Sequence, residues 1–190
     1  MDIALLRALN GLRTPALDAV SGALNAWGFY LLPFLAVLAA VIRREREVVT
    51  RAREVVLAWY VGLTCAEDVL KAVIHRPRPT AVPALRAALH VLGRVPSASS
   101  HAFPSGTATA MFAASTAIWL AFGRRAGIAA TVFATLVSAT RVYAGVHYPS
   151  DLVGGACVGA GVAWLLHRLS RWLDDGRTSA VPRPTPRTDA

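Results

Sequence analysis

Residues 140–151 read TRVYAGVHYPSD, a short polar stretch between two apolar blocks. The blocks on either side, residues 126–143 and 150–166, are each close to the length that an α-helix needs to cross a bilayer. Polar groups at the ends of such helices are costly unless they pair with one another or bind something. This stretch therefore predicts a membrane protein with a polar site at one end of a helical bundle.

The composition of the whole chain agrees with a membrane protein. Of its 190 residues 55% are hydrophobic, and the formal net charge is +9. A basic soluble protein would suggest a nucleic-acid partner. Here the arginines flank apolar blocks, which is typical of orientation in a membrane and of contact with anionic lipid headgroups. We therefore expect the bilayer as a partner and no nucleic acid.

The apolar blocks predict an all-α integral membrane helical bundle of about five to six spans. A short amphipathic helix over residues 2–12 is expected to lie in the membrane interface. Residues 16–42 fit either one long kinked span containing Pro33, or a short interfacial helix followed by a span from about Trp27. A short surface helix is predicted at residues 85–92. Four further spans are predicted at residues 55–74, 103–122, 126–143 and 150–166.

Charge sets the expected orientation and domain limits. Five arginines lie between residues 43 and 54, which predicts a cytoplasmic loop there and an external position for the polar stretch. Residues 1–173 are expected to form one transmembrane domain. Residues 174–190 are rich in proline and poor in apolar side chains, which predicts a disordered cytoplasmic tail.

A first polar cluster, residues 71–79, ends the second predicted span. Lys71 and Arg78 lie on one helical stripe with acidic residues, so one interpretation is a self-neutralising seam in which Glu67 or Asp68 pairs with Lys71. The other interpretation places the ammonium and guanidinium groups at the outer end of the span, facing an anion. The prolines on both sides of Arg78 stiffen the backbone, which suits bidentate binding of a phosphate.

Two further clusters also allow both a structural and a functional interpretation. Ser105 and Gly106 open a predicted helix, which is either an ordinary N-terminal cap or an anion site made by free backbone N–H groups. His147 is followed four residues later by Asp151, which either caps the next helix or orients the imidazole ring so that its other nitrogen can attack. Arg141 lies six residues before the histidine.

Taken together, the three clusters resemble the type 2 phosphatidic acid phosphatase family over roughly residues 55–170. The resemblance rests on three spacings: Lys71-x6-Arg78-Pro79, Pro104-Ser105-Gly106 and Arg141-x5-His147-x3-Asp151. The short chain and the outward-facing site look most like the small bacterial undecaprenyl-diphosphate phosphatases. The resemblance implies a hydrolase of lipid phosphates in the bacterial cell membrane.

The resemblance also implies a role for each motif residue. His147 would form a phosphohistidine, and Asp151 would orient it. No metal or other cofactor is implied, because basic side chains hold the substrate. The residues that would bind the phosphate are Lys71, Arg78, Ser105, Gly106, Thr107 and Arg141.

The chain departs from the family at Thr107. Family members have a histidine there that gives the leaving group its proton, and threonine cannot do so at neutral pH. One hypothesis is a polyprenyl diphosphate substrate, whose leaving group needs little help because the second pKa of a phosphate is about 6. The other is that His101 supplies the proton.

Two alternatives to a hydrolase remain open from the sequence. A phosphotransferase would pass the phosphoryl group from His147 to another lipid or sugar, and a non-catalytic binder would keep the phosphate site without the acid. The presence of both His147 and Asp151 favours an enzyme. A separate feature, the glycine-rich face of residues 154–161, predicts close helix packing within the bundle or a homodimer.

Overall fold

The computed structural model describes residues 1–93, 96–97 and 100–179, with side chains up to residue 174. Within these residues the chain is helical and contains no β-strand, only an isolated bridge between Pro77 and His101. The elements in chain order are α1 (Asp2–Gly11), α2 (Pro15–Ala23), η1 (Leu24–Gly28), α3 (Phe29–Arg43), α4 (Arg46–Thr64), η2 (Cys65–Leu70), α5 (Lys71–Val73), η3 (Pro79–Ala81), α6 (Pro83–Arg86), α7 (Gly106–Phe122), α8 (Arg124–Tyr143) and α9 (Pro149–Ser179).

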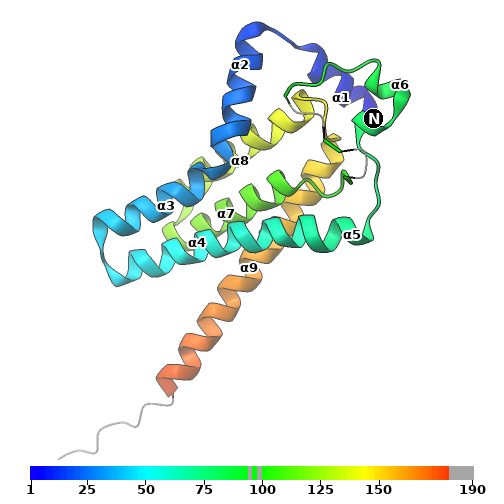
Figure 1. The fold of residues 1–190 in the computed structure, drawn as a ribbon. Helices are drawn as coiled ribbons and strands as arrows, with labels where there is room; N and C mark the ends of the chain where they lie inside the picture. Colours follow the sequence, from blue (N-terminus) through cyan, green and yellow to red (C-terminus); the bar gives the residue numbers. More distant parts are fainter. Residues whose placement is uncertain (94–95, 98–99, 180–190) are drawn as a thin grey trace, which may run out of the picture.

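Helix α7 lies at the centre of the bundle, in contact with α4, α8 and α9 (Figure 1). It is apolar and rich in alanine, so its neighbours approach it closely on several sides. Ala113 and Ala114 are fully buried, and they share the main core with Val55 of α4 and Val137 of α8. The start of α7 is therefore held firmly at one end of the bundle.

Glycines on α9 make its contact with α7 especially close. A Cβ atom at Gly159 would lie 2.2 Å from the carbonyl oxygen of Thr109, and one at Gly155 would lie 2.9 Å from the carbonyl oxygen of Ser105. Only a residue without a side chain fits at such distances. The close helix packing predicted from the glycine-rich face is thus present within the bundle.

Residues 15–43 form one continuous helical stretch that bends. Helices α2 and α3 meet at an angle through the π-helical turn η1 (Figure 1). A π turn inserts an extra residue into the helix and commonly bends it. The structure therefore agrees with one long bent span, with the bend at η1 rather than at Pro33, which lies inside α3.

The prediction of an arginine-rich loop at residues 43–54 is wrong. Helix α4 already begins at Arg46, and Arg44, in a left-handed conformation, ends α3. Charge does not prevent a helix here, because Ala52 and Val55 bury one face while the pair Glu47–Arg51 lies one turn apart on the other.

Other boundaries differ by smaller amounts. Helix α7 begins at Gly106 rather than at residue 103, and α8 begins two residues before the predicted start. Helix α9 continues to Ser179, past residue 173, where we placed the end of the domain. The remainder of the predicted tail, residues 180–190, lies outside the described residues.

The N-terminal helix α1 matches its predicted position and covers the end of the bundle. Its Leu6 is fully buried against Leu85 and Leu89, from the segment predicted to form a surface helix. That segment forms a shorter helix, α6, followed by a turn. The same cluster includes Tyr148, which immediately precedes α9, and α1 also contacts α9 itself.

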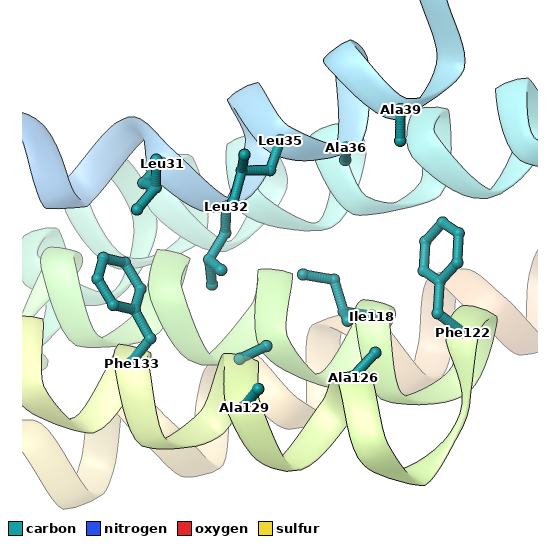
Figure 2. A pocket seen from close by; sticks show the side chains of 11 residues that line it. Leu31, Leu32, Leu35, Ala36, Ala39, Ile118, Phe122, Ala126, Ala129 and Phe133 are labelled. Carbon is teal, nitrogen blue, oxygen red and sulfur yellow. The ribbon is translucent and has the colours of Figure 1, made fainter. Parts of the chain in front are cut away.

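The outer surface of the bundle is suited to lipid. Within the described residues, three helical stretches are long and apolar enough to cross a membrane, and they are Pro15–Arg43, Arg124–Tyr143 and Pro149–Asp174. Helix α7 is a shorter apolar helix. An open groove of about 430 Å³ lies between α3, α7 and α8. Figure 2 shows its apolar lining, which includes Leu32, Ile118 and Phe133. These features confirm the prediction of an all-α membrane bundle.

Candidate active site

The three polar clusters meet at one end of the bundle. Lys71 begins α5, Ser105 caps α7, and His147 lies in the turn between α8 and α9 (Figure 1). The backbone N–H of Ser105 donates to the carbonyl oxygen of Asp151 at 3.0 Å, which joins the starts of α7 and α9. Segments far apart in the sequence thus form one polar site.

His147 and Asp151 form a buried pair at the start of α9. The Asp151 side chain is fully buried, and its Oδ2 lies 3.3 Å from Nδ1 of His147 and accepts the backbone N–H of Tyr148 at 2.8 Å. On the other side of the ring, Nε2 of His147 lies 2.9 Å from Nη1 of Arg78. A guanidinium group only donates, so Nε2 must accept and the ring proton lies on Nδ1, facing Asp151.

The protonation state of His147 follows from its surroundings. Burial lowers the pKa of His147 to about 4, and the hydrogen bond with Asp151 only partly offsets this. The positive charge of Arg78 acts in the same direction as burial. The ring is therefore neutral at pH 7, as a nucleophile requires.

Arg78 is held in a fixed position beside the histidine. Its side chain is buried, and besides Nε2 of His147 it contacts the carbonyl oxygen of Val146 at 3.1 Å and Oγ of Ser100 at 2.8 Å. The 3₁₀ turn η3 starts at the following proline and fixes the backbone. A guanidinium fork held in this way is arranged for bidentate binding of a phosphate.

Lys71 pairs with Glu67, as one interpretation of the sequence predicts. Nζ of Lys71, which is 6% exposed, donates to Oε1 of Glu67 at 2.5 Å. The carboxylate extends over the start of α7, where a Cβ atom on Gly106 would lie 2.0 Å from Oε1. Arg78 and Arg141 also lie close enough to interact with the Glu67 charge. An acidic side chain therefore reaches the place predicted to bind phosphate.

Arg141 supplies a third cation. Its Nη1 donates to Oδ1 of Asn25 at 2.9 Å, so the polar residue near the bend of the first span holds it in place. Its Nε is buried and has no hydrogen-bond partner among the described residues. Because Arg78 is near enough to repel it, an anion between the two arginines would relieve this repulsion and accept the free donor.

Arg76 is a site residue that the sequence analysis missed. Its Nη1 donates to Oδ1 of Asp151 at 2.7 Å and to Oγ of Ser150 at 2.6 Å, and its Nη2 donates to Oδ2 of Asp2 at 2.7 Å. Its guanidinium group also lies 4.2 Å from the centre of the Tyr148 ring. Arg76 therefore links the N-terminal helix to the carboxylate that orients the histidine.

The sequence contains a signal that could have identified Arg76. Arg76 precedes a proline, as Arg78 does, and the same argument about a stiff backbone applies to both. Asp2 gives no such signal, because its contact with Arg76 spans 74 positions of the chain and depends on how α1 folds over the bundle. Asn25 and Ser100 were missed for the same reason.

His101 and Thr107, the two residues discussed in connection with the missing acid, have different surroundings. The ring of His101 packs edge-on against His75, with 4.7 Å between the ring centres. His101 lines a pocket of about 300 Å³ together with Glu67, Lys71 and Ser100. Thr107 is the second residue of α7 and is half-buried.

The family model of the PAP2 superfamily matches residues 53–175, about two thirds of the chain, and this range contains all three clusters. The chain belongs to the PAP2 superfamily. The resemblance to type 2 phosphatidic acid phosphatases is therefore confirmed, and with it the prediction of a hydrolase of phosphoric esters.

Similar PAP2 proteins are found by sequence and by structure. A lipid A 4'-phosphatase of Bacteroides thetaiotaomicron is 26% identical over 97% of this chain and 83% of its own length. The crystal structure of Aquifex aeolicus LpxE has a TM-score of 0.71, with 23% identity, over 88% of this chain and 94% of that one. The transmembrane PAP2-type phosphatidylglycerolphosphate phosphatase of Bacillus subtilis has a TM-score of 0.68, with 24% identity, over 90% and 85% of the two chains.

Proposed function

We propose that this PAP2 protein hydrolyses a phosphate or diphosphate group of a membrane lipid through a phosphohistidine on His147. The observation that carries the proposal is the environment of that ring. Nε2 of His147 lies 2.9 Å from Arg78, while Nδ1 faces the buried carboxylate of Asp151. A neutral imidazole oriented by a carboxylate and facing a cation is suited to attack on phosphorus.

Attack on phosphorus requires one contact of the site to change. Arg78 donates to the lone pair of Nε2 that would attack. A bound phosphate offers the guanidinium group better acceptors, so Arg78 turns to the phosphate oxygens and frees Nε2. Lys71, Arg141 and the start of α7 at Ser105 and Gly106 hold the other oxygens. Water then hydrolyses the phosphohistidine.

A lipid substrate is supported by where the site lies and by the names of the relatives. The site is at the end of helices with an apolar outer surface, at the level where lipid headgroups would lie. The relatives are named a lipid A 4'-phosphatase and a phosphatidylglycerolphosphate phosphatase. We propose that this end faces outward in a bacterial cell membrane, because the arginines between residues 43 and 54 lie at the opposite end.

Thr107 bears on the choice between two substrate classes. When the terminal phosphate of a polyprenyl diphosphate is attacked, the leaving group is the polyprenyl monophosphate, which needs little help from an acid. A lipid monoester releases an alkoxide, which needs a proton from the protein. His101 lines the pocket beside Lys71 and is one residue that can supply it.

Phosphate release by purified protein tests the proposal. We expect release from at least one of polyprenyl diphosphate, polyprenyl phosphate and phosphatidic acid, and none from the His147→Gln variant, because the reaction path is lost with its nucleophile. With labelled substrate, an acid-labile phosphohistidine should be detected on the wild-type protein. A phosphotransferase would instead require an added acceptor, and a non-catalytic binder would release no phosphate from any of these lipids.

A further inference from the structure

The carboxylate of Glu67 lies among the groups that we propose to bind the phosphate. It accepts a hydrogen bond from Lys71, and its Oε1 would touch any atom added at Gly106, where α7 offers its first backbone N–H groups. Arg78 and Arg141 complete the positive surroundings. A phosphate bound to these same groups would therefore lie directly beside Glu67, or would displace it by a short distance.

Glu67 has room and freedom for that displacement. Its side chain is 44% exposed, although its partner Lys71 is buried. The residue lies in the π-helical turn η2 and lines the pocket of about 300 Å³ next to the phosphate site. Ser100, which accepts a hydrogen bond from Nε of Arg78, lines the same pocket. The pocket therefore lies beside Lys71 and Arg78, the two cations that we propose to hold the phosphate.

We propose that Glu67 is the acid that protonates the leaving group, a role for which this chain has only Thr107 at the usual position. This assignment rests on the proposed function. The second pKa of a phosphate monoester is about 6. At a pH close to this value, part of the substrate enters the site as the monoanion and carries a proton with it. The proton passes from the phosphate to the Glu67 carboxylate, which lies beside the proposed phosphate site, and from there to the leaving oxygen.

The phosphoryl transfer takes place in two steps. Nε2 of His147 forms a bond to phosphorus while the bond from phosphorus to the leaving oxygen breaks, and that oxygen keeps the electron pair and takes the proton of Glu67. In the second step water takes the place of the alcohol and gives a proton to the Glu67 carboxylate. As the oxygen of water bonds to phosphorus, the bond to nitrogen breaks and its electron pair returns to Nε2. Glu67 then passes this proton to the product phosphate, which leaves as the monoanion, and Glu67 is again the carboxylate that pairs with Lys71.

Glu67 fits this role better than its two neighbours. His101 lines the same pocket, but its ring packs against His75, whereas Glu67 contacts Lys71 and lies over Gly106. Asp68 is exposed and follows Glu67 in the chain, so its side chain leaves the helix in a different direction. Asp68 therefore serves as a matched control for a change of charge in the same turn.

The test compares two substrates that differ in their need for an acid. An alkyl lipid monoester needs a proton on its leaving oxygen, whereas an aryl phosphate such as p-nitrophenyl phosphate releases a weakly basic phenolate. In Glu67→Gln the amide oxygen can still accept the hydrogen bond from Lys71, so the phosphate site keeps its shape. We expect this variant to hydrolyse the lipid monoester about 10²–10⁴-fold more slowly and the aryl phosphate within a few-fold of wild type. Asp68→Asn should leave both rates unchanged.

Each other outcome contradicts the assignment. Equal losses on both substrates would mean that Glu67 only positions Lys71. Faster hydrolysis of both would mean that the carboxylate merely competes with phosphate. If wild-type protein hydrolysed the aryl phosphate and a diphosphate but no lipid monoester, the site would lack an acid while the proposed function would stand. Only a wild-type protein that releases phosphate from none of the substrates would remove the proposed function as well.

Discussion

At the scale of single residues, His147 accepts a hydrogen bond at the nitrogen that would attack phosphorus. We predict that nitrogen NMR of the histidine-labelled protein finds the ring proton on Nδ1 and a titration midpoint near 4, because burial disfavours the charged ring. The ring is neutral above that midpoint and charged below it. Comparison with His147→Gln assigns the signal. A midpoint near the ordinary value of 6.5, or a proton on Nε2, would contradict the geometry.

Because Arg76 donates to Asp151, we propose that it acts on His147 through this carboxylate, as a positioning residue. We predict that Arg76→Gln lowers kcat about tenfold with little change in KM, because Asp151 loses a partner at 2.7 Å while the phosphate-binding groups stay in place. Loss of this cation should also raise the pKa of His147, since Asp151 is then less neutralised. Kinetics and the NMR titration measure the two effects.

The control for Arg76 is Arg86, which is exposed on α6. Arg86→Gln should change neither kcat nor the titration of His147. A loss of kcat in Arg76→Gln without any movement of the titration midpoint would indicate a general loss of structure, and would overturn the positioning role.

At the scale of elements, the contact between α7 and α9 fixes the site. We predict that Gly159→Val lowers the free energy of unfolding by about 1–3 kcal/mol, because the new side chain would collide with the backbone of α7 at Thr109. Gly161→Val is the matched control, since a Cβ atom at Gly161 meets nothing within 4 Å. Thermal unfolding in detergent measures both. Equal shifts in Tm would contradict the assigned packing.

Much of this arrangement follows from the sequence, and the rest depends on tertiary contacts. Apolar block lengths predict the helices, and motif spacings predict that Lys71, Arg78 and Arg141 gather near His147. The early start of α4 is not predicted, because the charges of residues 43–54 indicate a loop, although Ala52 and Val55 already repeat at helical spacing. The reach of Glu67 over Gly106 could not be predicted, since it depends on how closely two helices approach.

At the scale of the whole molecule, the site and the turn between α7 and α8 lie at opposite ends of the bundle (Figure 1). We predict that, in a variant without Cys65 and Cys157, a cysteine at Ala81 is labelled in intact cells by an impermeant reagent. A cysteine at Gly123 should be labelled only after permeabilisation, because arginines flank that end of the bundle. The reverse pattern would turn the site to the cytoplasm.

Helix α9 extends well beyond the other helices in Figure 1. Its 31 residues span about 46 Å, against about 30 Å for the hydrocarbon layer of a bilayer. Asp151 is fixed at one end, and Arg168 and Arg171, both exposed, lie at about one membrane thickness from it. A thinner bilayer would increase the tilt of α9 and a thicker one would decrease it, and either change would shift Asp151 and Ser105 against the segment that carries Lys71. We therefore expect the rate of hydrolysis, measured in vesicles of one headgroup, to pass through a maximum as the acyl chains are lengthened, so that membrane thickness acts on this enzyme as an effector would.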